Sequence, residues 1–127
     1  MFEKIHHIAV IASDINISKY FYTEILGFEI LAETYREARD SWKIDLALNG
    51  NYLIELFSFP DAPDRLDGPE GLGLRHLAFT VKDMATTVTL LKERGVAVEA
   101  VRRDELTGAA YTFFKDPDGL PIELVEG

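Results

Sequence analysis

Two stretches of this chain carry the same alternation of apolar and polar positions. One runs from His7 to Asp14 and the other from His76 to Asp83, so that each begins at a histidine and ends at an aspartate seven residues later. Side chains of a strand alternate between its two faces, so each stretch predicts a strand with one purely apolar face. The two histidines are 69 residues apart, which indicates a motif that occurs twice.

A helical pattern follows each stretch. Its apolar positions recur at helical spacing, at Ile17, Tyr20, Phe21 and Ile25 in the first half and at Met84, Val88 and Leu91 in the second. Asp14 and Asp83 stand where helix N-caps are expected, and Gly27 and Gly95 stand where the residue after a helix is expected. The pattern therefore predicts one helix in each half.

The remainder of each half predicts strands and turns. Extended apolar stretches begin at residues 28–31 and 96–99, and turn signals at Asn49-Gly50 and at residues 116–119 each precede another apolar strand. Each half therefore predicts a strand, a helix and about three further strands, which is an α+β architecture. We expect a first module over residues 1–59, a linker rich in proline and glycine over 60–73, and a second module over 74–127.

Four ionisable residues fall on matching positions of the predicted strands. His7 and Glu55 belong to the first half and His76 and Glu123 to the second, and each lies on the strand face opposite the apolar row. Buried carboxylates need a partner, a proton or a metal ion. Two imidazoles and two carboxylates suit one divalent ion per site, of the Ni, Zn, Co, Mn or Fe(II) type.

Taken singly, each of these residues has a simpler interpretation. A lone histidine at the start of a strand is usually structural, and a lone glutamate is usually a charge on an edge strand. The duplication favours the metal site, because two ligand-type residues occur at equivalent positions in both halves. His6 has the opposite parity from His7, so we expect it at the surface or facing the helix.

Composition excludes several function classes. The chain has no cysteine, so a disulfide scaffold and a thiolate metal site are excluded. Its formal net charge of −9 and the absence of any basic run beyond Arg102-Arg103 argue against nucleic acid and anionic membranes as partners. It has no apolar run long enough for a bilayer and no signal-peptide pattern, so we expect a cytoplasmic protein.

The sequence resembles the vicinal oxygen chelate superfamily, which includes glyoxalase I, methylmalonyl-CoA epimerase, extradiol dioxygenases and the fosfomycin- and bleomycin-resistance proteins. The resemblance covers essentially the whole chain. It is carried by IHHIAV around His7, YLIELF around Glu55, LRHLAFTV around His76 and DPDGLPIEL around Glu123. It implies two paired βαβββ modules that form a sheet cup around a metal ion, usually in a homodimer.

The order His, Glu, His, Glu is similar to the ligand set of bacterial glyoxalase I. The resemblance implies a metal-dependent lyase or isomerase that abstracts a proton next to a carbonyl while the metal holds the enediolate. It assigns the base to Glu123, with Glu55 as second candidate, and His7 and His76 as metal ligands. The substrate would be a small α-hydroxycarbonyl or hemithioacetal compound.

Two positions depart from the glyoxalase I pattern. That enzyme usually has an arginine four residues after its first ligand and an asparagine four residues after its second, and both contact glutathione; here these positions hold Ile11 and Phe59. Neither side chain pairs with a carboxylate, so the resemblance does not extend to glutathione as the thiol. Other polar residues are candidates for substrate binding, namely Arg36, Arg39, Trp42 and Arg103.

Three alternative functions remain at this stage. A methylmalonyl-CoA-epimerase-like isomerase would use the same chemistry. An Fe(II) dioxygenase is disfavoured by a fourth protein ligand, because oxygen activation needs open coordination positions. A non-enzymatic dimer that sequesters a cationic drug would suit the acidic charge but not the complete ligand set.

Overall fold

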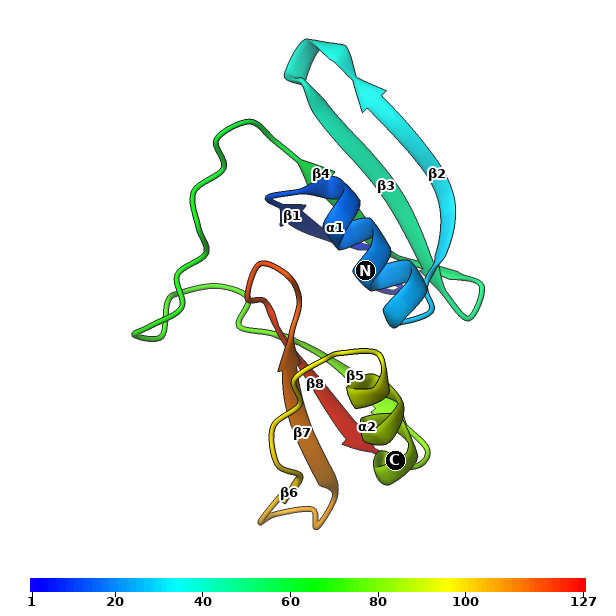
Figure 1. Cartoon of the computed structure of the whole chain (residues 1–127), viewed down its shortest axis with the longest axis vertical. Coiled ribbons are helices and arrows are strands. Elements are labelled where there is room, and N and C mark those ends of the chain that lie inside the picture. The colour runs from blue at the N-terminus through cyan, green and yellow to red at the C-terminus, as the bar shows by residue number, and fades with distance from the viewer. The chain divides into compact units, whose positions relative to one another are not determined.

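A computed structural model describes all 127 residues, and the chain divides into two compact units, Met1–Asp64 and Arg65–Gly127. Both units have the same topology (Figure 1). The first consists of β1 (Ile8–Ala12), α1 (Ile15–Tyr20), the π-helix η1 (Phe21–Ile25), β2 (Glu29–Arg36), the 3₁₀ turn η2 (Glu37–Arg39), β3 (Ser41–Leu48) and β4 (Asn51–Ser58). The second consists of β5 (Leu77–Val81), α2 (Met84–Glu93), β6 (Arg102–Arg103), β7 (Ala110–Lys115) and β8 (Pro121–Glu126).

Each unit is a four-stranded mixed sheet. The strand orders are β1-β4-β3-β2 and β5-β8-β7-β6, and in each sheet the first strand runs parallel to its neighbour while the other pairs are antiparallel. The predicted α+β fold of two βαβββ modules is therefore confirmed. A βαβ-type connection places the helix against one face of the sheet, and the opposite face remains for other contacts.

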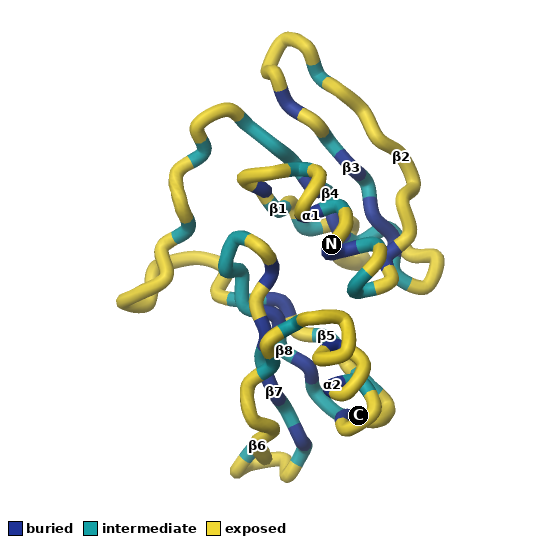
Figure 2. The backbone as a smooth tube through the Cα atoms, viewed as in Figure 1, coloured by how far each residue is buried: buried dark blue, intermediate teal, exposed yellow.

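The core of each unit lies between its helix and its sheet. Apolar side chains on one parity of the strands are buried there, including Ile44, Leu46, Ile54 and Leu56 in the first unit and Leu77, Ile122 and Leu124 in the second. The intervening residues of these strands lie on the opposite face. Figure 2 shows buried positions recurring along β3, whereas β2 is exposed over almost its whole length.

The helix of the first unit begins where the sequence predicted, but only part of the predicted apolar face is buried. The Asp14 carboxylate accepts hydrogen bonds from the backbone N–H groups of Asn16 and Ile17, which makes it the predicted N-cap. Ile17 and Tyr20 are exposed, however, and the buried residues are Ser18, Phe21 and Tyr22. The helical pattern was therefore wrong at Ile17 and Tyr20. The last turn is widened to a π-helix, which rotates the residues that follow.

The second unit differs from the expectation in one strand. Residues 96–99, predicted to be extended and apolar, are not part of a strand, and the short β6 forms only at Arg102–Arg103. The segment stays close to β7 through two hydrogen bonds of Glu99, whose N–H donates to the Phe113 carbonyl and whose carbonyl accepts from the Thr112 hydroxyl.

The predicted turns are confirmed. β3 and β4 are joined by Asn49-Gly50 with φ of 50° and 80°, which is the left-handed pair that a tight hairpin requires. Helix α2 buries Met84, Val88 and Leu91 as predicted, and the predicted Gly95, with φ of 85°, follows its cap residue Arg94. No helix of the structure has the length and apolarity that a membrane crossing demands.

Candidate functional site

The first predicted histidine and the first predicted glutamate lie together. His7 precedes β1 by one residue, and Ala9 of β1 is paired with Glu55 of the parallel strand β4. Residues two apart on a strand share a face, so His7 and Glu55 lie on the same side of the sheet. The Nε2 atom of His7 is 3.7 Å from Oε2 of Glu55.

The second unit repeats this arrangement in the same register. Ala78 of β5 is paired with Glu123 of β8, so His76 is again diagonally next to the glutamate. The Nε2 atom of His76 is 3.1 Å from Oε1 of Glu123, and both side chains are largely buried, with 25% and 20% of their surface exposed. Both predicted pairs therefore form, one in each unit.

Three residues that the sequence analysis did not single out surround Glu55. The hydroxyl of Tyr52 lies 2.8 Å from Oδ1 of Asp45 and 3.1 Å from Oε2 of Glu55. The Lys43 ammonium lies 3.0 Å from Asp45 and 3.8 Å from Glu55. Burial, followed by the hydrogen bonds to Asp45 and Glu55, raises the pKa of Tyr52 well above its ordinary value. Tyr52 therefore remains protonated and donates to the carboxylates.

A β-bulge explains why the sequence pattern missed Tyr52. Leu46 pairs with Ile54 and Ala47 pairs with Tyr52, so Leu53 is an extra residue on β4. A bulge breaks the two-residue alternation of a strand. Tyr52 and Glu55 therefore reach each other although they are three residues apart, a spacing that a regular strand would direct to opposite faces.

Glu123 has a different environment. Its directly paired residue on β7 is Phe113, whose ring meets the His76 ring edge-on at 5.2 Å. The Arg102 guanidinium lies over Tyr111 at 5.0 Å and over Phe113 at 5.9 Å. The carboxylate of Glu123 has one hydrogen-bond partner, His76. The two halves thus present the same pair in a polar setting and in an aromatic one.

The ring nitrogens distal to the glutamates also have partners. His7 Nδ1 is 2.7 Å from His6 Nδ1, and His76 Nδ1 is 3.1 Å from the Arg75 guanidinium. Arg75 is itself held by Glu70, whose pKa the hydrogen bond from Arg75 lowers. These contacts orient both rings so that Nε2 faces the carboxylate.

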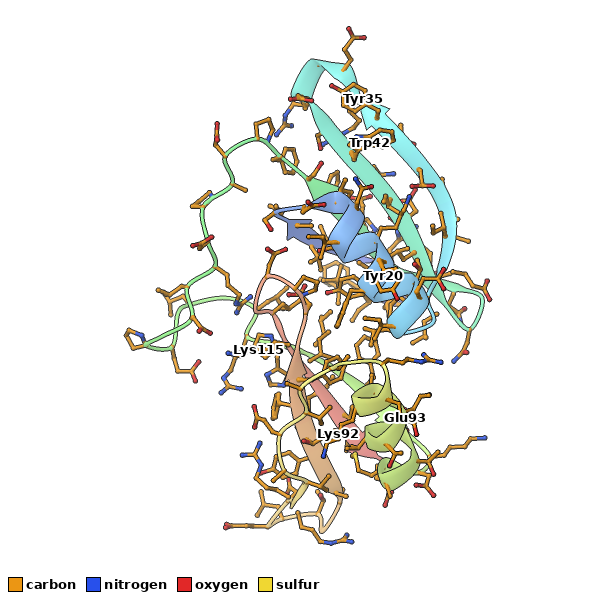
Figure 3. The ribbon with its side chains drawn as sticks, in the orientation of Figure 1. Tyr20, Tyr35, Trp42, Lys92, Glu93 and Lys115 are labelled. Atoms are coloured by element: carbon orange, nitrogen blue, oxygen red, sulfur yellow. The ribbon has the colours of Figure 1, made fainter.

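The predicted substrate-binding residues fall into two groups. Arg36 and Arg39 stack on aromatic rings of the first unit: Arg36 lies 4.8 Å from the centre of Phe57, and Arg39 lies 5.0 Å from that of Phe59. Lys43 pairs with Phe57, which is two residues from Glu55, so Lys43 lies on the Glu55 face of the sheet. Its neighbour Trp42 therefore lies on the other face. Trp42 there contacts Tyr35, with ring centres 5.3 Å apart (Figure 3).

Arg103 also lies on the face away from the glutamate of its unit. Arg102 pairs with Tyr111, so the neighbouring Arg103 has the other parity, and it donates a hydrogen bond to the Gly108 carbonyl. Arg102 is the arginine that shares a face with Glu123. The sequence could not distinguish these adjacent residues, because the register of β6 was not predicted.

The donor atoms fit a divalent ion. Two ligands bound to one ion at about 2.1 Å lie roughly 3.0–3.4 Å apart at octahedral or tetrahedral angles, close to the 3.1 and 3.7 Å that separate Nε2 and carboxylate oxygen in the two pairs. Imidazole nitrogen and carboxylate oxygen suit Zn, Ni, Mn or Fe(II). Neither unit by itself brings three such side chains into a metal-binding group.

Comparison with known proteins decides the family. The profile described as Glyoxalase/Bleomycin resistance protein/Dioxygenase superfamily matches residues 4–124. The chain belongs to this superfamily. One curated relative is the uncharacterized protein YaeR of Escherichia coli, which is 57% identical over 98% of this chain and 96% of the relative. The uncharacterized protein YwkD of Bacillus subtilis is 56% identical over 99% and 98%.

A solved structure shows the same superfamily fold. The glyoxalase family protein from Enterococcus faecalis has 46% sequence identity and a TM-score of 0.93, with 98% of each chain covered. More distant superfamily relatives include a probable lactoylglutathione lyase of Synechocystis, 29% identical over 94% of this chain, and a 2-epi-5-epi-valiolone epimerase of Actinomyces, 27% identical over 95%. Enzymes are thus present among its relatives.

Proposed function

We propose that this protein is a metal-dependent lyase or isomerase of the glyoxalase type. The observation that carries the proposal is the repeated His–Glu pair, formed in the same strand register in both units with Nε2 directed at a carboxylate oxygen. His7, Glu55, His76 and Glu123 would together hold one divalent ion. The distant relatives named as lactoylglutathione lyase and epimerase support chemistry next to a carbonyl.

A divalent ion bound by these residues would polarise a substrate carbonyl and stabilise negative charge on its oxygen. The chain's own contribution is proton transfer. Glu123 takes the proton from the carbon beside the carbonyl, because its carboxylate is held by His76 alone. Glu55 is less free to move, because Tyr52 donates to it and Lys43 lies close by.

The destination of the proton decides the reaction. Its return from Glu123 to the neighbouring carbon completes an isomerisation, as in a glyoxalase. Proton delivery to the opposite face of the same carbon, with Glu55 as the donor and Glu123 keeping the abstracted proton, completes an epimerisation, which is the alternative function. A small α-hydroxycarbonyl or hemithioacetal compound fits either course.

Superfamily members often form dimers, and we propose a homodimer here. Light scattering should then give twice the 14.3 kDa mass of the chain.

Metal analysis of protein purified without a tag tests the proposal first. We expect about one divalent ion per chain in the wild type, and its loss in His76→Ala and Glu123→Gln. Glu93→Gln is the matched control, because Glu93 is an exposed carboxylate on α2. Wild-type protein that binds no divalent ion under saturating conditions would refute the metal site.

Proton exchange with solvent tests the chemistry. In deuterium oxide, the metal-loaded wild type should introduce deuterium at the α-carbon of α-hydroxycarbonyl compounds and form an isomer or epimer. Glu123→Gln should lower this rate by about 100-fold or more, since a positioned general base contributes 10²–10⁴-fold. Oxygen consumption without exchange would instead favour a dioxygenase.

A further inference from the structure

Two arginines of the first unit converge on an aromatic surface without a carboxylate partner. Arg36 lies 4.8 Å from the ring centre of Phe57 and 5.6 Å from that of Phe59, and Arg39 lies 5.0 Å from Phe59. The two rings are stacked on each other, with centres 5.4 Å apart. The rings hold the guanidinium planes and leave their N–H edges free for a ligand.

Neither guanidinium has an acidic partner, although the chain carries 22 acidic residues against 13 basic ones. In the same unit Lys19 does pair with Glu33, and Lys43 with Asp45. Arg36 donates only to the Ser41 hydroxyl, at 3.3 Å, and its buried Nε atom meets no acceptor. Buried polar groups in native proteins nearly always have a hydrogen-bond partner, so this donor has room for an acceptor that the chain does not supply.

This cluster lies on the same sheet face as Glu55. Phe57 follows Glu55 by two residues on β4 and pairs with Lys43, and Arg36 has the parity of the strand positions on that face. The order along the face is therefore His7 and Glu55, then Phe57, then the arginines. One step of two residues along a strand is about 7 Å. A substrate whose carbonyl group contacts Glu55 therefore reaches the guanidiniums with a group only a few bonds further along the molecule.

The neighbouring strand supplies an apolar floor rather than a charge. Ile11 of β1 pairs with Phe57 and is 53% exposed. Arg36 reaches the same aromatic residue from the β2 side of the sheet. The cationic groups beside Phe57 therefore come from the β2–β3 side, and β1 adds an apolar side chain.

We propose that Arg36 and Arg39 form an anion-binding subsite that takes the carboxylate or phosphate end of the substrate while its carbonyl end reaches Glu55. This inference rests on the proposed function and adds the substrate class: an α-hydroxycarbonyl compound with an anionic group a few bonds from the reacting carbon. Guanidiniums bind planar carboxylates and phosphates through paired N–H bonds.

Calorimetric titration of the protein with matched compounds, in the presence of a divalent ion, tests the subsite. Dihydroxyacetone phosphate against dihydroxyacetone probes a phosphate end, and hydroxypyruvate against hydroxyacetone probes a carboxylate end. We expect the wild type to bind at least one anionic compound about tenfold or more tightly than its neutral counterpart. Arg39→Gln and Arg36→Gln should each weaken that compound by about 10- to 100-fold and leave the neutral one unchanged.

Further variants separate recognition from packing. Arg39 is exposed, so Arg39→Gln should keep the thermal midpoint, and Arg36→Lys keeps the charge but loses the flat guanidinium. Lys19→Gln removes an equal charge from the helix side of the same unit and should keep the preference. No anionic preference in the wild type, or an unchanged preference in both glutamine variants, overturns the subsite.

The same samples distinguish the two proposals. If metal content and deuterium exchange are retained while the arginine variants change no affinity, the subsite is refuted and the proposed function stands. If the arginine variants abolish the anionic preference while the wild type neither holds metal nor exchanges protons, the subsite stands and the proposed function is refuted.

Discussion

Glu55 and Glu123 occupy equivalent positions in the two units, yet their neighbours differ. The residue paired with Glu55 across the sheet is Asp45, and the residue paired with Glu123 is Phe113. Glu55 therefore lies in a hydrogen-bonded polar cluster, whereas Glu123 lies among aromatic rings with His76 as its partner. The His–Glu pair is the same in both units, and the surroundings of its two carboxylates differ.

Removal of the Tyr52 hydroxyl tests whether this cluster positions Glu55. Tyr52→Phe deletes the hydroxyl between Asp45 and Glu55, so these two carboxylates keep only Lys43 as a shared neighbour. We expect the affinity for a divalent ion to fall by about 10- to 100-fold, as for other groups that orient metal ligands. Titration of metal-free protein measures it. Tyr20→Phe, on an exposed residue of α1, is the control, and equal affinities of the two variants would contradict this role.

Tyrosine titration checks the same residue independently. Burial and the hydrogen bonds to Asp45 and Glu55 raise the pKa of Tyr52. A raised pKa stabilises the folded state below the ordinary tyrosine pKa near 10 and loses that effect as pH rises through the folded value. Wild type and Tyr52→Phe should therefore show the same tyrosinate absorbance near pH 10. A larger absorbance in the wild type would show that Tyr52 ionises normally.

At the scale of elements, the two helices depend on their aspartate caps. The Asp83 carboxylate accepts from the Thr86 N–H, and this backbone hydrogen bond is the main cause that lowers the pKa of Asp83. A lowered pKa means that the ionised cap stabilises the folded state above the ordinary value near 3.8 and loses this effect as pH falls through the folded value. The contribution of this cap to the stability of the folded protein therefore depends on pH.

Urea unfolding of Asp83→Ala at several pH values tests the cap. We expect a lower urea midpoint than that of wild type at pH 7, and a difference that narrows as pH falls below about 4. Asp14→Ala removes the corresponding cap of α1 and should cost about 1 kcal/mol. Asp64→Ala, at an exposed position, serves as control. A difference that stays constant with pH would show that the Asp83 charge is not responsible.

The elements also show where a pattern of apolar residues is insufficient. The Asn49-Gly50 turn and the strands on either side follow local rules, and the structure has them as predicted. The face of α1 was wrong at Ile17 and Tyr20, because the π-turn and the packing of Tyr22 decide which side meets the sheet. The strand expected at residues 96–99 does not form, because Glu99 alone of these residues is hydrogen-bonded to β7 and the regular pairing begins at Arg102.

At the scale of the whole molecule, metal binding should contribute to stability. An ion that binds only the folded protein stabilises it by about 2.7 kcal/mol when its concentration is 100 times the dissociation constant. Chelation should therefore lower the thermal midpoint of the wild type, and added Ni, Zn, Co or Mn should restore it. The double variant His76→Ala/Glu123→Gln should be insensitive to chelator. An equal response of the wild type and the double variant would contradict binding at these residues.

The sequence by itself determined the duplicated topology, the helix caps, the hairpin turn and the two His–Glu pairs. Each of these depends on local propensity or on the two-residue alternation of a strand, both of which are readable from residue order. The family profile agrees with that fold over residues 4–124. A single histidine or glutamate in a strand indicates little, but the same pair repeated in both halves indicates a site.

Only the tertiary structure decided which other side chains join these pairs. The bulge at Leu53 brings Tyr52 to Glu55, strand register separates Arg102 from Arg103, and the fold of the β2–β3 hairpin sets Arg36 over Phe57. Each depends on contacts between segments distant in sequence. A shift of one residue in register reverses the face of every side chain, so no local pattern contains this information.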